Sequence, residues 1–116
     1  MSRTADSPPV PEKKRPPTLK ELRRKLRTFC RQRPIARLEV FGSVAEGVAK
    51  PGSDVDLMVT FRPETELGLE FIRMKLDLEE LLGCPVDLVE RVSVEKMKNP
   101  FKRRSILSCT RLIYAA

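Results

Sequence analysis

The stretch of sequence that decides the fold runs from residue 41 to residue 57 and reads FGSVAEGVAKPGSDVDL. An apolar strand ends at Phe41, a glycine and a serine open a short turn of helix, and a loop with glycine and proline leads into a second strand. Gly42 lets the backbone come close to a phosphate group. Ser43 supplies a hydroxyl and an N–H at the start of the helical turn, where the helix dipole favours anions. The pattern predicts a turn that holds a triphosphate between two strands.

The second strand opens with two aspartates, Asp54 and Asp56. Residues two apart on a strand point to the same side, with Cα atoms about 6.5 Å apart, so their carboxylates can share one hard cation. Two carboxylates this close cost on the order of a few kcal/mol when no counter-ion is present. We therefore expect the pair to bind a metal ion.

A third carboxylate, Asp87, lies at the centre of the apolar segment Val86-Asp87-Leu88-Val89. A charge inside an apolar strand is costly unless it is paired or coordinates a metal ion. Asp87 is therefore a third candidate ligand, and a half-exposed aspartate on an edge strand is the alternative.

The rest of the chain predicts an α/β (α+β) fold, with a small mixed β-sheet and helices on one face. Thr18 opens a capping box and a helix that stops before Pro34, and Asn99-Pro100 opens a short helix. A longer helix over 67–82 is apolar nearly all round, so we expect it to be covered on more than one side. Strands are predicted at 36–41, 54–61, 85–90 and 111–114, with one continuous helix over 106–114 as the alternative to the last strand.

Length and composition allow one domain and exclude several classes of enzyme. The 116 residues include no histidine, which excludes Ser-His-Asp and Cys-His nucleophiles, zinc sites of the Cys/His type and an imidazole base. Cys30, Cys84 and Cys109 are too widely spaced for a metal knuckle, and we expect buried thiols. Neither a signal peptide nor a membrane span is recognisable, so we expect a cytoplasmic protein with no membrane partner.

The positive charge is concentrated in the first third of the chain. Residues 1–34 hold 11 basic and 3 acidic side chains, and the remaining residues hold 12 and 13. Five of the ten prolines lie in residues 1–17, which we interpret as a disordered tail before a domain at 18–116. The basic side of the first helix is either a solvated surface or a cationic wall for phosphate or an acidic partner; it consists of Lys20, Arg23, Arg24, Arg27 and Arg31. The nearly neutral charge of residues 35–116 argues against nucleic-acid binding by the domain as a whole.

The spacing of Gly42-Ser43, ten residues and then Asp54-x-Asp56 resembles the minimal nucleotidyltransferases of the DNA polymerase beta-like superfamily. The signature of that family is GSx10DxD with a third acidic residue on a later strand, a position that Asp87 fits. The resemblance covers roughly residues 19 to 114. It implies two Mg2+ ions and ATP as substrate, with Asp54 and Asp56 binding both metals. It also implies that Asp87 binds the metal on the nucleophile side and helps to take the proton.

The same resemblance implies nucleotide-binding roles for Gly42, Ser43 and Ser53. Many relatives have a basic residue where this chain has Glu46, and Lys50 or the arginines of the first helix could replace that charge. Family members of this size are commonly antitoxins that transfer AMP to a tyrosine of a helical HEPN-domain toxin. The alternatives are an antitoxin that masks its toxin sterically and a nucleotidyltransferase that acts on a small molecule or an RNA end. Apolar residues of the 67–82 helix that face away from the sheet would form part of the docking face, or a second helix would cover them.

Overall fold

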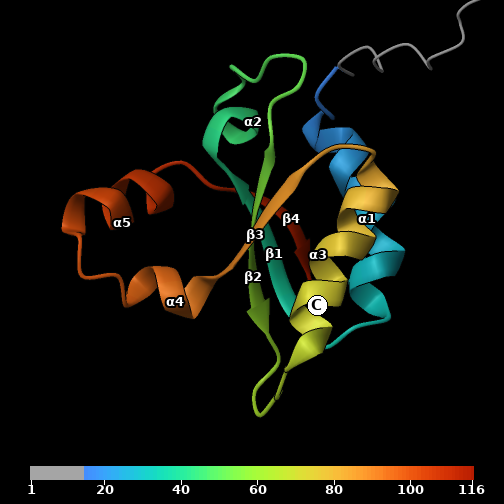
Figure 1. The fold of residues 1–116 in the computed structure, drawn as a ribbon, viewed down its shortest axis with the longest axis vertical. Coiled ribbons are helices and arrows are strands. Elements are labelled where there is room, and N and C mark those ends of the chain that lie inside the picture. Colours follow the sequence, from blue (N-terminus) through green and yellow to red (C-terminus); the bar gives the residue numbers. More distant parts are fainter. Residues whose placement is uncertain (1–14) are drawn as a thin grey trace, which may run out of the picture.

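The computed structural model describes residues 15–116, so most of the tail expected at 1–17 lies outside the described residues. The described chain forms a four-stranded mixed sheet in the order β3-β2-β1-β4 (Figure 1). The strands are β1 (Ile35–Phe41), β2 (Val55–Phe61), β3 (Val86–Glu90) and β4 (Arg111–Ala115). β1 is antiparallel to both of its neighbours, and β2 and β3 are parallel. The mixed sheet and the four predicted strands are confirmed, and the alternative helix over 106–114 is wrong.

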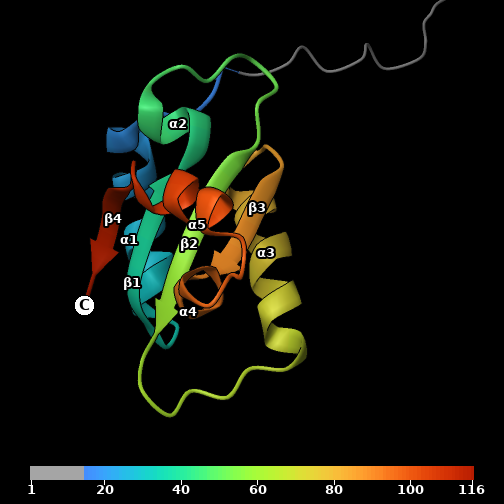
Figure 2. The same ribbon diagram turned by 90° about the vertical axis from the view of Figure 1, so that its left-hand side faces the viewer.

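Helices lie on both faces of this sheet (Figures 1 and 2). α1 (Leu19–Arg31) and α3 (Leu69–Leu82) cover one face, as predicted. The short helices α4 (Arg91–Glu95) and α5 (Pro100–Leu107) lie over the other face, and α2 (Gly42–Glu46) connects β1 to the loop before β2. The sequence did not predict α4 or a second covered face, because these short segments show too little periodicity to reveal where they pack.

The two faces have separate apolar cores of different size. The larger core joins α1 and α3 to the sheet, and Leu22, Leu26, Leu57 and Leu78 in it are fully buried. Among residues 15–116, the smaller core, under α4 and α5, has three buried members, which are Phe41, Met58 and Val94. The smaller core covers the middle of the sheet, so the end of the second face where β2 begins is not closed by apolar packing.

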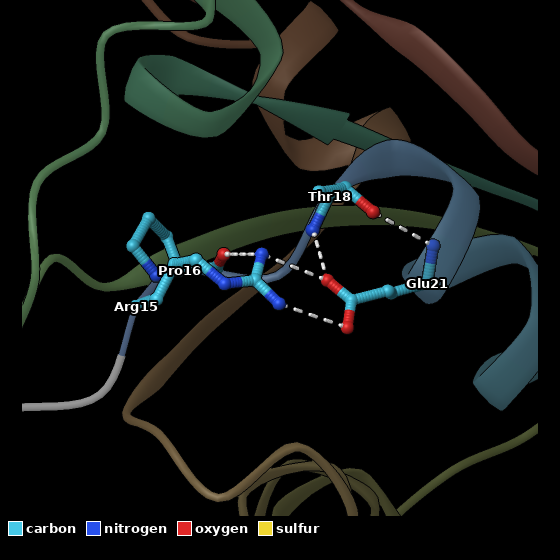
Figure 3. A network of polar contacts seen from close by, with 4 residues as sticks. All are labelled: Arg15, Pro16, Thr18 and Glu21. Carbon is cyan, nitrogen blue, oxygen red and sulfur yellow. Dashed lines mark hydrogen bonds and ion pairs between the residues drawn. The ribbon is translucent and has the colours of Figure 1, made fainter.

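A capping box begins α1 just after the described chain starts (Figure 3). The Thr18 hydroxyl accepts from the Glu21 N–H at 3.1 Å, and the Glu21 carboxylate accepts from the Thr18 N–H at 2.9 Å. The Arg15 guanidinium donates to both Glu21 oxygens, at 3.1 and 3.2 Å. The Thr18 N–H and then Arg15 lower the pKa of Glu21 to about 2. The capping box read from the sequence is therefore confirmed, and Arg15 strengthens it.

The outer side of α3 departs from the sequence prediction. Met74, Leu78 and Leu82 are buried against the sheet, but Leu69, Ile72 and Leu76 are 80%, 57% and 53% exposed. The expectation that this helix is covered on more than one side is wrong for the described residues, because no second helix reaches its outer face. Its role in docking a partner stays a prediction.

Of the three thiols that the sequence analysis expected to be buried, only one is fully buried. Cys30 is buried, and burial raises the pKa of its thiol to about 12, but Cys84 and Cys109 are only half-buried. No disulfide joins these three residues.

Within residues 15–116, every helix is too short or too polar to cross a bilayer.

Candidate active site

The candidate site lies at the end of the sheet where β1 ends and β2 begins, and α2 is part of the connection between these two strands (Figure 2). Gly42 starts α2 with a φ of +71°, a conformation that L side chains rarely adopt. A Cβ at this position would lie 2.1 Å from Oδ2 of Asp56. Glycine is therefore needed at position 42 for two reasons: the backbone has a positive φ, and the Asp56 carboxylate leaves no space for a Cβ.

The strand register places two of the predicted carboxylates side by side. Asp56 of β2 and Asp87 of β3 are direct partners across the parallel strands, so their side chains point to the same face. Val55 and Leu57, the chain neighbours of Asp56, are fully buried on the opposite face. Asp54 lies just before β2 and is exposed. The structure therefore brings Asp56, Asp87 and Gly42 together, with Asp54 at the rim.

The three carboxylates affect one another electrostatically. Burial, then the charge of Asp87 and then that of Asp54 raise the pKa of Asp56 to about 6. Within residues 15–116, none of these aspartates forms an ion pair with a lysine or arginine. A hard divalent cation would relieve the repulsion between these carboxylates, because no protein cation pairs with them in the described chain.

The residues fit a metal ion, although the site is open. In the described part of the chain, no three Asp, Glu or Cys side chains already surround a point where a metal ion could bind. Asp56 and Asp87 are adjacent and Asp54 is exposed, so the donor set consists of hard oxygen ligands and is free of competing cations. The chemistry of this set suits Mg2+ better than a metal that prefers nitrogen or sulfur ligands.

The two predicted serines lie in the segment that connects β1 to β2, Ser43 in α2 and Ser53 in the turn just before Asp54. Ser43 is half-buried in the first turn of α2, whose N-terminus no side chain caps. The Ser53 hydroxyl accepts from the Lys50 N–H at 3.0 Å, and the Ser53 N–H donates to the Lys50 carbonyl at 2.9 Å. Ser53 therefore closes the turn before Asp54, and its hydroxyl hydrogen remains available to a ligand. The nucleotide-binding roles of both serines stay predictions.

The structure also places the charges proposed to compensate for Glu46. Glu46 and Lys50 are both exposed in the segment that leads from α2 to the turn before β2. The basic side of α1 faces away from the larger core and hence lies across the sheet from Asp56. Of the two compensations considered, only Lys50 belongs to the loop of the candidate site.

The sequence reasoning missed an ion pair with a buried carboxylate, which lies further along the same face of the sheet, where Glu39 is paired with Met58 of β2. Glu39, in the central strand β1, is 2% exposed and accepts from Arg91 at 2.8 Å, with the Arg37 Nε at 3.5 Å. The hydrogen bond that Arg91 donates to Glu39 raises the pKa of Arg91, which is the first residue of α4. The argument that singled out Asp87, a charge inside an apolar strand, applies equally to Glu39 in IARLEVF and could have found it. This pair anchors α4 to the sheet.

The comparisons with known proteins agree with this geometry. A family model described as a nucleotidyltransferase domain matches residues 22–113. Protein adenylyltransferase MntA of Thermococcus cleftensis is 44% identical over 61 residues, which cover 53% of this chain and 61% of that protein. A solved structure that is provisionally described as a minimal nucleotidyltransferase is 36% identical to this chain. The match covers 82% of this chain and 95% of that chain, with a TM-score of 0.62.

A more distant structure shares the fold. It is the tri-AMPylated HEPN toxin of Shewanella oneidensis in complex with an MNT antitoxin; the matching chain is 15% identical, with a TM-score of 0.58 over 85% of this chain and 74% of that chain. The family model spans most of the described residues and includes the turn at Gly42 and all three aspartates. The chain therefore belongs to the nucleotidyltransferase domain family.

Proposed function

We propose that this chain is a magnesium-dependent nucleotidyltransferase that moves AMP from ATP to a tyrosine hydroxyl of a HEPN toxin and thereby acts as the antitoxin of that toxin. The observation that carries the proposal is the register of β2 and β3, which pairs Asp56 with Asp87 beside Gly42. This arrangement combines paired carboxylates without a counter-ion and a backbone turn that phosphate oxygens can approach closely.

In this reaction the acceptor oxygen forms a bond to the α-phosphorus of ATP. The bond from that phosphorus to the bridging oxygen of the β-phosphate breaks, and pyrophosphate leaves with the electron pair. Magnesium, when bound, would neutralise the phosphate charge and stabilise the leaving group. Asp54 and Asp56 would hold the metal ions, and Gly42, Ser43 and Ser53 would hold the phosphates.

The acceptor proton needs a base on the protein. Asp87 is exposed, whereas its strand partner Asp56 is half-buried, so of these two paired carboxylates Asp87 is the one that an incoming hydroxyl can reach. Asp87 would take the proton and pass it to solvent. No histidine is needed for this step, which agrees with a chain that contains none.

A protein acceptor is supported by what the described chain presents around the site. The domain is small, and the carboxylates lie at an open end of the sheet, so an acceptor that brings its own binding surface suits the site better than a small molecule that needs an enclosing pocket. The solved complex of an MNT antitoxin with its AMPylated HEPN toxin supports this class of partner.

The test is to incubate the purified protein with the HEPN-type protein encoded beside its gene, together with ATP and Mg2+. We expect the mass of that neighbour to grow in AMP-sized steps, and peptide mapping to place AMP on tyrosine. Asp56→Asn should abolish the modification, and Glu66→Gln, which removes an exposed carboxylate from the loop before α3, should not. A neighbour that is inhibited in a tight complex but stays unmodified would contradict the proposal in favour of steric masking. Labelled AMP on RNA or on a small molecule alone would contradict the acceptor and not the transfer.

A further inference from the structure

We propose that the outer side of α1 is a binding surface for a nucleic-acid backbone, separate from the carboxylate site. This surface, called here the basic strip, consists of Lys20, Arg23, Arg24, Arg27 and Arg31, all of which are exposed. Their spacing of three or four residues places them on one side of the helix. The charged surface is continuous along nearly the whole length of α1.

The charge of the basic strip is not neutralised within the described chain. Among residues 15–116, no ion pair includes a member of the strip. The one acidic residue of α1, Glu21, is already bound by Arg15 and by the helix N-terminus. Like charges three or four residues apart destabilise a helix, so the strip makes α1 less stable. A ligand that carries negative charge would remove this repulsion.

Part of the basic strip is hollowed. Four of its residues line a shallow hollow of about 470 Å³, namely Lys20, Arg23, Arg24 and Arg27. The Arg23 Nε donates to the Leu112 carbonyl of β4 at 3.0 Å, which holds this guanidinium beside the edge of the sheet. A guanidinium fixed through one N–H keeps its other donors for phosphate oxygens, which arginine binds in a forked geometry.

The composition of the basic strip favours nucleic acid over an acidic protein. Protein interfaces contain an apolar centre, and the outer side of α1 has none; its exposed positions are basic, apart from Thr28 and the partly exposed cap. Interfaces with nucleic acid are strongly positive and rich in contacts from arginine to phosphate. From Lys20 to Arg31 the helix rises about 16 Å, which matches roughly five steps of 3.4 Å along a nucleic-acid strand.

The position of the strip leaves the carboxylate site accessible. α1 packs on the face of the sheet opposite to α4 and α5 (Figure 1). Asp56 lies on the face of α4 and α5, because Met58, two residues further along β2, belongs to the core on that face. A nucleic acid on α1 and an acceptor at Asp56 can therefore bind at the same time. The basic strip does not depend on the proposed transfer reaction, so the two proposals can fail separately.

The test measures binding of a labelled RNA and a labelled DNA duplex, each of about 20 nucleotides per strand, by fluorescence anisotropy from about 50 to about 200 mM salt. The variant Arg23→Gln/Arg24→Gln/Arg27→Gln removes the centre of the strip. Its matched control, Arg62→Gln/Arg73→Gln/Lys98→Gln, removes the same charge from exposed positions on other elements. We expect the strip variant to bind at least about tenfold more weakly at low salt and to lose about 0.7 to 0.9 from the salt slope per lost phosphate contact. The control should bind like the parent chain.

Three results would overturn this proposal. Equal affinity of the strip variant and its control would show that only net charge matters. Absence of binding to both RNA and DNA at the lowest salt would remove the ligand class. Competition by polyglutamate as effective as competition by RNA, at equal charge concentration, would assign the strip to an acidic protein. A difference between RNA and DNA would identify which nucleic acid is bound, and AMP transfer by the strip variant should equal that of the parent chain.

Discussion

The two sides of strand β2 have opposite properties although they belong to the same seven residues. On one side Val55, Leu57 and Val59 are fully buried in the core beneath α1 and α3. On the other side Asp56 lies half-buried next to Asp87, and only further along the strand does Met58 enter the small core beneath α4.

This difference shows how a small domain separates stability from chemistry. Burial of apolar side chains on the side of α1 and α3 supplies the free energy of folding. The opposite side leaves one end uncovered, where the paired carboxylates repel each other, and we propose that they serve the reaction. Substitutions on the two sides of β2 should therefore have different consequences, and the following predictions test that separation.

The largest effect is expected from Asp56→Asn, which should lower AMP transfer by orders of magnitude. Its melting temperature without divalent cations should stay unchanged or rise, because the change removes a charge whose pKa is raised to about 6 by burial and by neighbouring aspartates. Transfer assays and thermal melts in EDTA measure the two properties. Undiminished transfer, or a large loss of stability, would place Asp56 among the residues that hold the fold.

On the opposite side, Leu57→Ala should lower the free energy of unfolding by about 2 to 5 kcal/mol. Leu57 is fully buried, so the shortened side chain leaves a cavity in the larger core. Urea unfolding at pH 7 measures the change. If Leu57→Ala were no less stable than Asp56→Asn, the proposed division between the two sides of β2 would be wrong.

Two glycines allow a matched test of the turn itself. Gly42 and Gly47 have nearly the same φ, 71° and 75°, so an alanine at either position costs a similar backbone strain of about 1 to 2 kcal/mol. Only at Gly42 would the new Cβ meet the Asp56 carboxylate, at 2.1 Å, whereas at Gly47 nothing lies within 4 Å. Gly42→Ala should therefore destabilise the protein more than Gly47→Ala and displace Asp56, with loss of AMP transfer. Equal loss of transfer in both variants would show that backbone strain alone is responsible.

The smallest expected effect is on the pH dependence of stability. The folded chain holds the Asp56 proton up to a pKa of about 6, above the ordinary aspartate value of 3.8. The contribution of Asp56 to stability is thus full below about pH 4 and is lost as pH rises to about 6. In EDTA, the free energy of unfolding of the parent chain should fall over this range relative to Asp56→Asn. A constant difference between the two proteins would contradict the raised pKa. The comparison with the variant cancels Glu21 and Glu79, whose lowered pKa values act in the opposite direction.

Several parts of the site could be read from the sequence because they depend on residues close together in the chain. The capping box at Thr18, the helical turn after Gly42 and the alternation in β2 are local patterns, and the structure confirms them. The glycine ends of α2 and α3, Gly47 and Gly83, both adopt the left-handed conformation, which lies within reach of sequence reasoning for the same reason.

Other features could not be predicted because they depend on residues far apart in the sequence. The choice of Arg91 as the partner of Glu39 and the exposure of Leu69, Ile72 and Leu76 are decided by which elements cover these positions. The same holds for the hollow of the basic strip, which needs Leu112 of β4 to hold Arg23.

The sequence by itself determined which residues are the candidates for the chemistry, since Gly42-Ser43 and the three aspartates are chemically distinctive at their spacing. Only the tertiary structure decided how they meet. The register of the parallel strands β2 and β3 pairs Asp56 with Asp87, and the closeness of β1 to β2 places the Asp56 carboxylate over Gly42. Strand pairing is set by packing between distant segments, so a local pattern can name the partners but cannot specify which of them lie side by side.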